Sequence, residues 1–331
     1  MLQLITTLIA LWLLAWVIVL ILLRNPSRSY TGPASVSGIY DMWANDPKMK
    51  FYWGNHLHAG FYGQPAGRKD FIRAKFDMID ALANWGIAQP APTILQQLEN
   101  PQPGAIPIRI LDVGCGVGGS AVYLAERWGK GVQITGITLS GVQADYATRL
   151  ARSRGLENVS FLKCDAMNQA FAAGSFDIIW SLESEMHMPD KERFMLEMAR
   201  LLKPGGRVIV ATWNVRDPFV APLSASEQKH VQYLVNEWCH TSFDSIPESI
   251  QLFERCGFSE IHAEDWAQAT MPSWREAIFV ALRNGNGLGW SKPVAWWGNI
   301  RDAYTILLYD SAFRKGLCEY GVFRAQKPAG A

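Results

Sequence analysis

The sequence carries little charge of either sign and few cysteines. Lys and Arg total 31 against 30 Asp and Glu, so the formal net charge is +1 over 331 residues. A protein that binds nucleic acid through many phosphate contacts needs a basic excess, so this balance argues against that class. The five cysteines lie far apart, with no C-x-x-C pair and no Cys/His cluster at zinc spacing. We therefore expect no nucleic-acid partner, no bound metal and no disulfide framework.

Long uncharged runs are absent except at the N-terminus. Leu2–Leu23 contains no charged residue, and its length is close to the ~20 residues with which a helix crosses a bilayer. A cleaved secretory signal is the alternative, but no basic residue precedes the run and no small-x-small site follows it directly. Arg24 and Arg28 follow the run, and basic flanks mark the cytoplasmic side. The sequence thus predicts a single-pass membrane protein with an anchor at residues 1–24 and the remainder on the cytoplasmic side.

The rest of the chain divides by composition into four parts. Residues 25–38 are rich in Ser, Gly and Pro, which predicts a tether. Residues 39–107 predict an N-terminal lid with a helix over Asp70–Trp85 and, because of five prolines, no regular structure over Gln89–Pro107. Residues 108–214 predict a ligand-binding core, and residues 215–331 predict a helical cap with two sheet-closing strands.

Short β-branched runs alternate with helical patterns through the predicted core. This alternation is typical of βαβ units and therefore of a mostly parallel sheet covered by helices on both faces. We predict an α/β fold with a seven-stranded sheet. The predicted strands are 108–113, 132–138, 159–162, 176–182, 207–213, 260–266 and 320–325, and the predicted helices of the core and cap are 119–129, 142–154, 191–202, 224–238, 248–256, 274–283 and 300–313.

A glycine-rich loop joins the first predicted strand of the core to its helix. Glycines at 114, 116, 118 and 119 remove the Cβ at four positions of the turn, so a ligand can approach the backbone N–H groups of the helix start. A tight turn without a ligand is the alternative. A dinucleotide site would carry an acid at the end of the second strand, but Gly136–Ser140 contains none. A nicotinamide oxidoreductase is therefore disfavoured.

Two motifs carry a family resemblance. Ile110–Ser120 (ILDVGCGVGGS) together with Leu201–Gly206 (LLKPGG) resembles the class I methyltransferases that use S-adenosylmethionine, which have a Rossmann-like sheet. Gly136–Gln143 (GITLSGVQ) resembles the sterol and cyclopropane-synthase branch, where a Thr and a Gln replace the usual ribose acid. The resemblance implies that the cofactor is S-adenosylmethionine and that it contacts Asp112, Gly114, Gly116, Gly119, Thr138, Gln143, Asp165 and Ala166. For Asp165, a helix cap or a turn is the alternative role.

Further segments narrow the resemblance. Trp180–Asp190, Ala211–Asp217 and Tyr52–Gly63 are similar to the tocopherol and plastoquinone methyltransferases. The N-terminal apolar run followed by Tyr40–Trp43, together with Lys69–Lys75 and Thr305–Phe323, resembles the cyanobacterial 2-methyl-6-phytyl-1,4-benzoquinol type among them, whereas Trp180–His187 is equally similar to the γ-tocopherol group. The resemblance to the benzoquinol type implies C-methylation of the ring of a prenylated benzoquinol drawn from the bilayer, with Tyr40 and Trp180 as further cofactor contacts. The alternatives are a γ-tocopherol or sterol-like acceptor, or a module that binds S-adenosylmethionine without catalysis.

The stretch before the first predicted helix is dense in aromatic and His residues. We predict Tyr52, Trp53, His56 and His58 as substrate contacts. The rings could instead stabilise the sulfonium cation of the cofactor or only seal the lid. A metal site at the two histidines lacks further ligands. In the C-terminal part, the Trp-rich segment Gly287–Gly298 predicts either a contact with the membrane surface or a buried apolar wall.

The end of the fourth predicted strand carries the candidate base. Glu183, Glu185 and His187 follow it within five residues, at the sheet edge where ligands bind in such folds. An imidazole has an ordinary pKa near working pH, which favours proton transfer. We predict His187 as base or substrate-hydroxyl partner and Glu183 near the methyl-transfer centre. A purely structural role of His187 as a helix cap is the alternative.

Overall fold

The computed structural model describes residues 22–45, 51–88, 92–283 and 293–330, and before them Thr7, Leu14, Val17 and Val19. Its centre is a seven-stranded sheet in the order β3-β2-β1-β4-β5-β7-β6. Strands β1 to β5 run parallel, and β7 is antiparallel to both β5 and β6. The strands are β1 (Ile108–Val113), β2 (Val132–Thr138), β3 (Val159–Lys163), β4 (Phe176–Leu182), β5 (Leu202–Val215), β6 (Ser259–Asp265) and β7 (Cys318–Gln326). The predicted α/β fold with a Rossmann-like sheet is confirmed.

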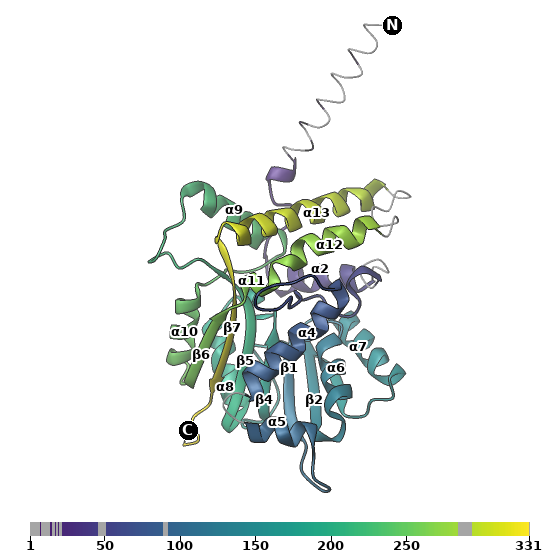
Figure 1. The fold of residues 1–331 in the computed structure, drawn as a ribbon, viewed down its shortest axis with the longest axis vertical. Coiled ribbons are helices and arrows are strands. Elements are labelled where there is room, and N and C mark those ends of the chain that lie inside the picture. Colours follow the sequence, from purple (N-terminus) through teal and green to yellow (C-terminus); the bar gives the residue numbers. More distant parts are fainter. Residues whose placement is uncertain are drawn as a thin grey trace.

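Helices cover both faces of the sheet and gather over one of its ends (Figure 1). Those beside the sheet are α4 (Phe71–Ala83), α5 (Pro92–Glu99), α6 (Gly119–Trp128), α7 (Gly141–Ser153), α8 (Lys191–Leu201) and α10 (Ile246–Arg255). Those toward one end are α2 (Pro33–Asn45), α9 (Ala225–Glu237), α11 (Ala267–Thr270), α12 (Pro272–Arg283) and α13 (Pro293–Arg314). Short helical turns are η1 (Asn84–Ala88), η2 (Gly129–Gly131) and η3 (Glu185–His187).

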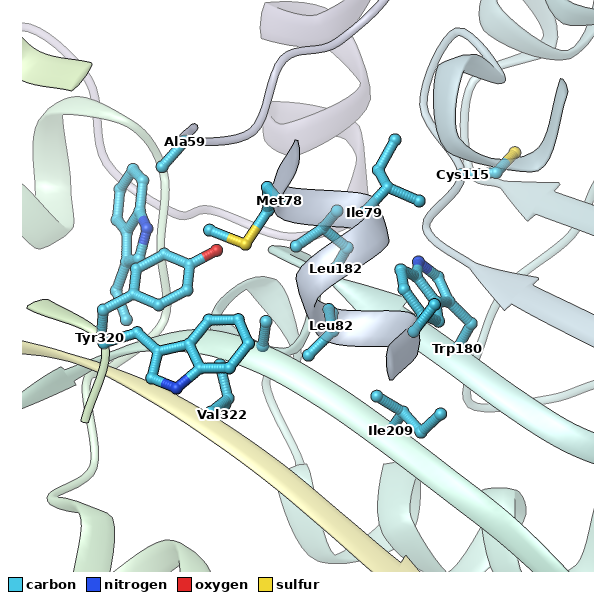
Figure 2. Close-up of a cluster of buried hydrophobic side chains, with 14 of the residues drawn as sticks. Ala59, Met78, Ile79, Leu82, Cys115, Trp180, Leu182, Ile209, Tyr320 and Val322 are labelled. Carbon is cyan, nitrogen blue, oxygen red and sulfur yellow. The ribbon is translucent and has the colours of Figure 1, made fainter. Parts of the chain in front are cut away.

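Alternating side chains along β5 explain why both faces of the sheet are buried. Val208 and Val210 belong to the hydrophobic cluster under α8 and α10, while Ile209 and Ala211 belong to the cluster under α4. Figure 2 shows the cluster under α4, with side chains of α4 above those of β4, β5 and β7. A strand buried on both faces reads as a continuous apolar run. This is why these strands are visible in the sequence.

Two segments that the sequence predicts to be irregular are helical. Helix α5 lies inside the proline-rich stretch, and α2 begins at Pro33 inside the predicted tether. Both helices begin with proline, which is tolerated in the first turn because that N–H has no intrahelical partner. The start of the predicted tether is also held in place, because Ser27 donates through N and Oγ to the carboxylate of Glu237, at 2.7 and 2.9 Å.

The predicted membrane anchor and single-pass location, with the remainder on the cytoplasmic side, are corrected. Among the described residues, no helix combines the length and apolarity that a bilayer span requires. The longest one, α13, carries Arg301, Asp302, Asp310 and Arg314, and charges at such positions oppose membrane insertion. Most of Leu2–Leu23 lies outside the described residues, as does most of the Trp-rich segment Gly287–Gly298.

Candidate active site

Three cavities meet at the sheet edge formed by the ends of β1, β2 and β4, and Tyr40 and Glu183 line all three. The loop cavity includes Asp112, the glycine loop, His56 and His58, and has about 460 Å³ of free space. The strand cavity includes Thr138, Gln143, Asp165 and His187, with about 790 Å³. The aromatic cavity includes Trp43, Tyr52, Trp53, Trp213, Trp238 and Trp274, with about 1300 Å³. A ligand in one cavity can therefore reach a ligand in another at Tyr40 and Glu183.

The glycine loop has no room for side chains because two other segments pack on it. A Cβ on Gly119 would lie 1.9 Å from the carbonyl oxygen of Asn55, and one on Gly114 would lie 2.3 Å from the Cβ of Ser184. Gly114 also has a φ of +75°, which favours glycine. The loop is thus a backbone surface enclosed by the lid and by the end of β4.

Asp112 stands at the end of β1 beside this loop. Its Oδ2 is buried and has no hydrogen-bond partner within the described part of the chain. Burial raises the pKa of the carboxyl group to about 7. A buried acceptor with no donor is costly, so the carboxyl group is prepared for a cationic or hydrogen-bonding ligand in the loop cavity.

The strand cavity contains four of the predicted cofactor contacts, Thr138, Gln143, Asp165 and Ala166. Thr138 Oγ1 donates to Gln143 Oε1 at 2.8 Å, and Gln143 Nε2 is buried without a partner among the described residues. Ala166 is buried beside Asp165, whose Oδ1 accepts from Met167 N at 2.9 Å. Asp165 therefore makes the turn bond that the alternative role requires, and it lines the cavity as well.

Helix α2 closes the strand cavity from the lid side. Pro33, Val36, Ser37 and Tyr40 contribute to its wall. The helix is fixed to α7, because Asp41 accepts a hydrogen bond from Ser140, the residue that caps α7. The N-terminal lid is thereby joined to the ligand-binding edge of the sheet.

Trp180 does not reach any of the three cavities. It is predicted as a cofactor contact, but its side chain is fully buried in the cluster under α4 (Figure 2). The reason is the alternation along β4, which directs residue 180 into the core and leaves Glu183, just beyond the strand, at the cavities.

Glu183 is held at the junction in a defined orientation. Its Oε1 accepts from the backbone N of Ala59 and from the hydroxyl of Tyr320, both at 2.8 Å. Burial raises the pKa of the carboxyl group, while the Ala59 N–H, the Tyr320 hydroxyl and the Lys75 ammonium oppose that shift. The φ of +55° at Glu183 is uncommon for a non-glycine residue, and such conformations cluster at functional sites.

His187 is a neutral base already engaged by a tyrosine. Its Nδ1 lies 3.1 Å from the carbonyl oxygen of Cys239, which can only accept, so Nδ1 carries the proton. Nε2 then accepts from the Tyr40 hydroxyl at 2.9 Å. Burial lowers the pKa of His187 to about 4. Asp190 caps α8 by accepting from Arg193 N at 2.9 Å, so His187 does not fill the alternative capping role.

The four predicted substrate contacts separate into two pairs. Tyr52 and Trp53 line the aromatic cavity, whereas His56 and His58 line the loop cavity. The chain turns at Gly54, which has a φ of +63° and divides the two pairs. Burial lowers the pKa of His56 to about 3, so it is neutral.

Several cavity residues were not predicted from the sequence. Tyr320 reaches Glu183 only because β7 inserts beside β5, with Tyr320 opposite Trp213. Trp213, Trp238 and Trp274 pack on one another and on Tyr309 behind the aromatic cavity. The high Trp content was the available signal, but it does not tell which rings meet.

Comparison with known proteins assigns the chain to a family. A profile described as "Methyltransferase domain" matches residues 111–210. The 2-methyl-6-phytyl-1,4-hydroquinone methyltransferase of Synechocystis sp. is 38% identical, with 90% of this chain and 89% of that protein covered. The chain belongs to this methyltransferase family. The chloroplastic tocopherol O-methyltransferase of Arabidopsis thaliana is 33% identical over 83% of this chain and 77% of its own length.

Solved structures show the same fold as this methyltransferase. The [4+2]-cyclase SpnF has a TM-score of 0.68 with 24% identity, covering 92% of this chain and all of its own. Geranyl diphosphate C-methyltransferase from Streptomyces coelicolor A3(2), solved with S-adenosyl-L-homocysteine, has a TM-score of 0.63 with 21% identity, covering 91% of this chain and 100% of its own. Because one of these proteins is a cyclase, the fold alone does not define the reaction.

The cofactor of the methyltransferase is S-adenosylmethionine, and the chemistry of the cavities fits it. The Asp112 carboxylate, whose Oδ2 has no hydrogen-bond partner among the described residues, suits its ammonium group, and the glycines of the loop leave the backbone accessible. Gln143 Nε2, which also lacks a partner among the described residues, offers a donor to the ribose. The apolar surroundings of Ala166 and Met167 suit a flat base.

Proposed function

We propose that the protein transfers the methyl group of S-adenosylmethionine to a ring carbon of a prenylated benzoquinol. The observation that carries this proposal is the aromatic cavity, which joins the other two at Tyr40 and Glu183. A quinol ring suits the Trp and Tyr side chains that line this cavity. The names of the similar proteins, a phytyl hydroquinone methyltransferase and tocopherol methyltransferases, support this acceptor class.

The wall that α12 and α13 give the aromatic cavity suits a prenyl tail. Six of its side chains are small or apolar, and Asn299 and Asp302 of α13 add polar groups; the six are Ala277, Ile278, Ala281, Leu282, Ala303 and Ile306. Burying apolar surface contributes about 25 cal/mol per Å², so a long tail would supply much of the binding energy. The polar ring would then lie at the junction, where Tyr40, His187 and Glu183 provide hydrogen-bonding groups.

The bound cofactor supplies an electrophilic methyl group whose C–S bond breaks with the electron pair remaining on sulfur. The residues provide for the protons. A quinol hydroxyl can pass its proton to the Tyr40 oxygen while the Tyr40 proton moves to His187 Nε2. That nitrogen already accepts a hydrogen bond from the Tyr40 hydroxyl. This increases electron density on the ring. Glu183 can take the proton that the methylated ring carbon releases, and the proton held by His187 returns through Tyr40 to the quinol oxygen.

Isotope-labelled S-adenosylmethionine and a panel of acceptors test the proposal. The panel contains prenylated benzoquinols, the same quinols without the tail, a γ-tocopherol and a sterol. We expect label on a ring carbon of a prenylated quinol, located by mass spectrometry and NMR. Label on an oxygen, or transfer to the tocopherol or sterol in preference, would assign the other acceptor class.

A cavity-filling variant tests the tail site. Ala281→Trp should raise KM for the prenylated quinol at least tenfold while changing KM for the tail-free quinol little, since Ala281 lies on the α12 wall of the aromatic cavity. Ser226→Trp, on the exposed start of α9, is the matched control. An equal effect of Ala281→Trp on both acceptors would place the tail elsewhere.

A further inference from the structure

Lys75 is a fully buried lysine behind the junction of the cavities. It lies in α4 with no exposed surface. Its Nζ is 4.2 Å from the centre of the Trp53 ring and 4.6 Å from that of Phe71. A buried ammonium group is costly unless its charge is compensated. None of the ion pairs among the described residues includes Lys75, so its compensation comes from another arrangement.

That arrangement is a single peptide group between Lys75 and Glu183. Lys75 Nζ donates to the carbonyl oxygen of His58. The N–H of the same peptide, contributed by Ala59, donates to Glu183 Oε1 at 2.8 Å. The ammonium therefore lies at the negative end of the peptide dipole and the carboxylate at its positive end. Each charge strengthens the hydrogen bond of the other through the polarised peptide.

We propose that Lys75 is a positioning residue that keeps the Glu183 carboxylate ionised and oriented through the His58–Ala59 peptide. The inference rests on the proposed function, because it assigns Lys75 to the reaction in which Glu183 takes part. Lys75 itself lines none of the three cavities. Its effect on catalysis is therefore transmitted by Glu183.

The other titratable groups around Glu183 carry no opposing positive charge. Tyr40 of α2, Tyr309 of α13 and Tyr320 of β7 face it, and burial raises the pKa of each hydroxyl, which keeps all three neutral. His58, beside the bridging peptide, has a pKa held well below its ordinary value by burial and by Lys75. Among these described groups, Lys75 is the cation available to Glu183.

The electrostatic directions agree with the geometry. Burial lowers the pKa of the Lys75 ammonium to about 7, and Glu183 opposes that shift. Burial raises the pKa of Glu183, and Lys75 is among the groups that oppose it. Removing the lysine charge would raise the pKa of Glu183 further. The ionised fraction of Glu183 at a given acidic pH would then fall.

The pH profile of Lys75→Met tests this role in the full chain. The Lys75 ammonium and the Glu183 carboxylate are separated by one peptide group, so the loss of the lysine charge should raise the pKa of Glu183. We expect the acid limb of kcat to move to higher pH by about one unit and the loss of activity to recover at alkaline pH. Affinity for S-adenosylhomocysteine should stay within threefold. Lys69→Met is the matched control, because Lys69 also donates to a lid carbonyl, that of Phe61 at 2.9 Å, but the N–H of that peptide, contributed by Tyr62, donates to the carbonyl oxygen of Ala269 and not to Glu183.

A loss of kcat that is equal at every pH would show a structural role and overturn the proposal, as would an unmoved acid limb. If Lys75→Met does not fold, Lys75→Gln keeps a donor for the His58 carbonyl without the charge and must show the same displaced limb. Infrared titration of the wild type against Glu183→Gln requires neither lysine variant nor an acceptor. A protonated-acid band of Glu183 at pH 6 in the wild type would refute the inference, even if the acceptor proves to be another molecule.

Discussion

Replacing Asp112 by Asn should stabilise the cofactor-free protein while weakening cofactor binding. Burial raises the pKa of Asp112 from its ordinary 3.8 to about 7, so the folded protein opposes ionisation of this group. Each pKa unit corresponds to about 1.36 kcal/mol, so the ionised carboxylate costs about 4 kcal/mol at pH 8. The contribution of the neutral Asp112 carboxyl group to the free energy of unfolding is fully present below pH 3.8. It is lost as the pH rises toward 7. At pH 5 the cost is therefore only about 2 kcal/mol.

Scanning calorimetry at the two pH values measures this difference. With an unfolding entropy of about 2.1 cal/mol/K per residue, the gain at pH 8 corresponds to about 6 °C in Tm. Asp145→Asn, at an exposed position of α7, should change Tm little. Titration calorimetry should show S-adenosylmethionine binding weakened about 10–150-fold, the loss of a charge-assisted hydrogen bond of about 1.5–3 kcal/mol. A Tm gain that is absent, or equal at pH 5 and pH 8, would refute the claim that this carboxylate lacks a partner.

Three further substitutions probe the lid, the base and the fold. Gly119→Ala places a Cβ 1.9 Å from a lid carbonyl oxygen. Calorimetry should show a loss of about 1–3 kcal/mol of stability and at least a tenfold loss of cofactor affinity. Gly38→Ala, with open space around it, is the control, and equal behaviour of the two variants would contradict the close packing at Gly119. Tyr40→Phe removes the donor to His187 Nε2 and should lower kcat about 10–100-fold. Steady-state kinetics of the double variant with His187→Gln should show little additional loss, since the pair acts as one unit; additive losses would separate their roles. Arg301→Met leaves the fully buried Glu237 carboxylate without its ion-pair partner at 2.9 Å and should cost about 3–5 kcal/mol in denaturant unfolding, whereas a loss below about 1 kcal/mol would show that solvent reaches the carboxylate.

The elements of the sheet follow from the sequence because their information is local. The run from Ile108 to Val113 is a buried strand, and the glycines after it alternate with the buried side chains of Cys115 and Val117. The positions of Thr138 and Gln143 were also predictable, since each lies beside the carboxyl end of β2. At these positions the local sequence pattern and the folded structure lead to the same residues.

Other parts of the site depend on contacts between distant segments. Tyr320 reaches Glu183 through the register of β7 against β5, and Lys75 reaches it through a peptide of the lid. Trp180 lies in a motif but not in the site. Its position in β4 directs its side chain into the core under α4. Such roles require the packing of whole elements, which a motif of a few residues does not contain.

Because β7 lies inside the sheet, next to the edge strand β6, the site is complete only after β7 has been synthesised. β7 lies between β5 and β6 although it is translated after every other described strand, and its Tyr320 holds Glu183. A nascent chain therefore has an open gap beside β5 until Gln326 leaves the ribosome. A chain that terminates before β7 would lack the completed sheet. It would also lack the Tyr320 hydroxyl that donates to Glu183. Cells would thus produce either the entire enzyme or an inactive fragment with an exposed strand edge, which quality control can remove.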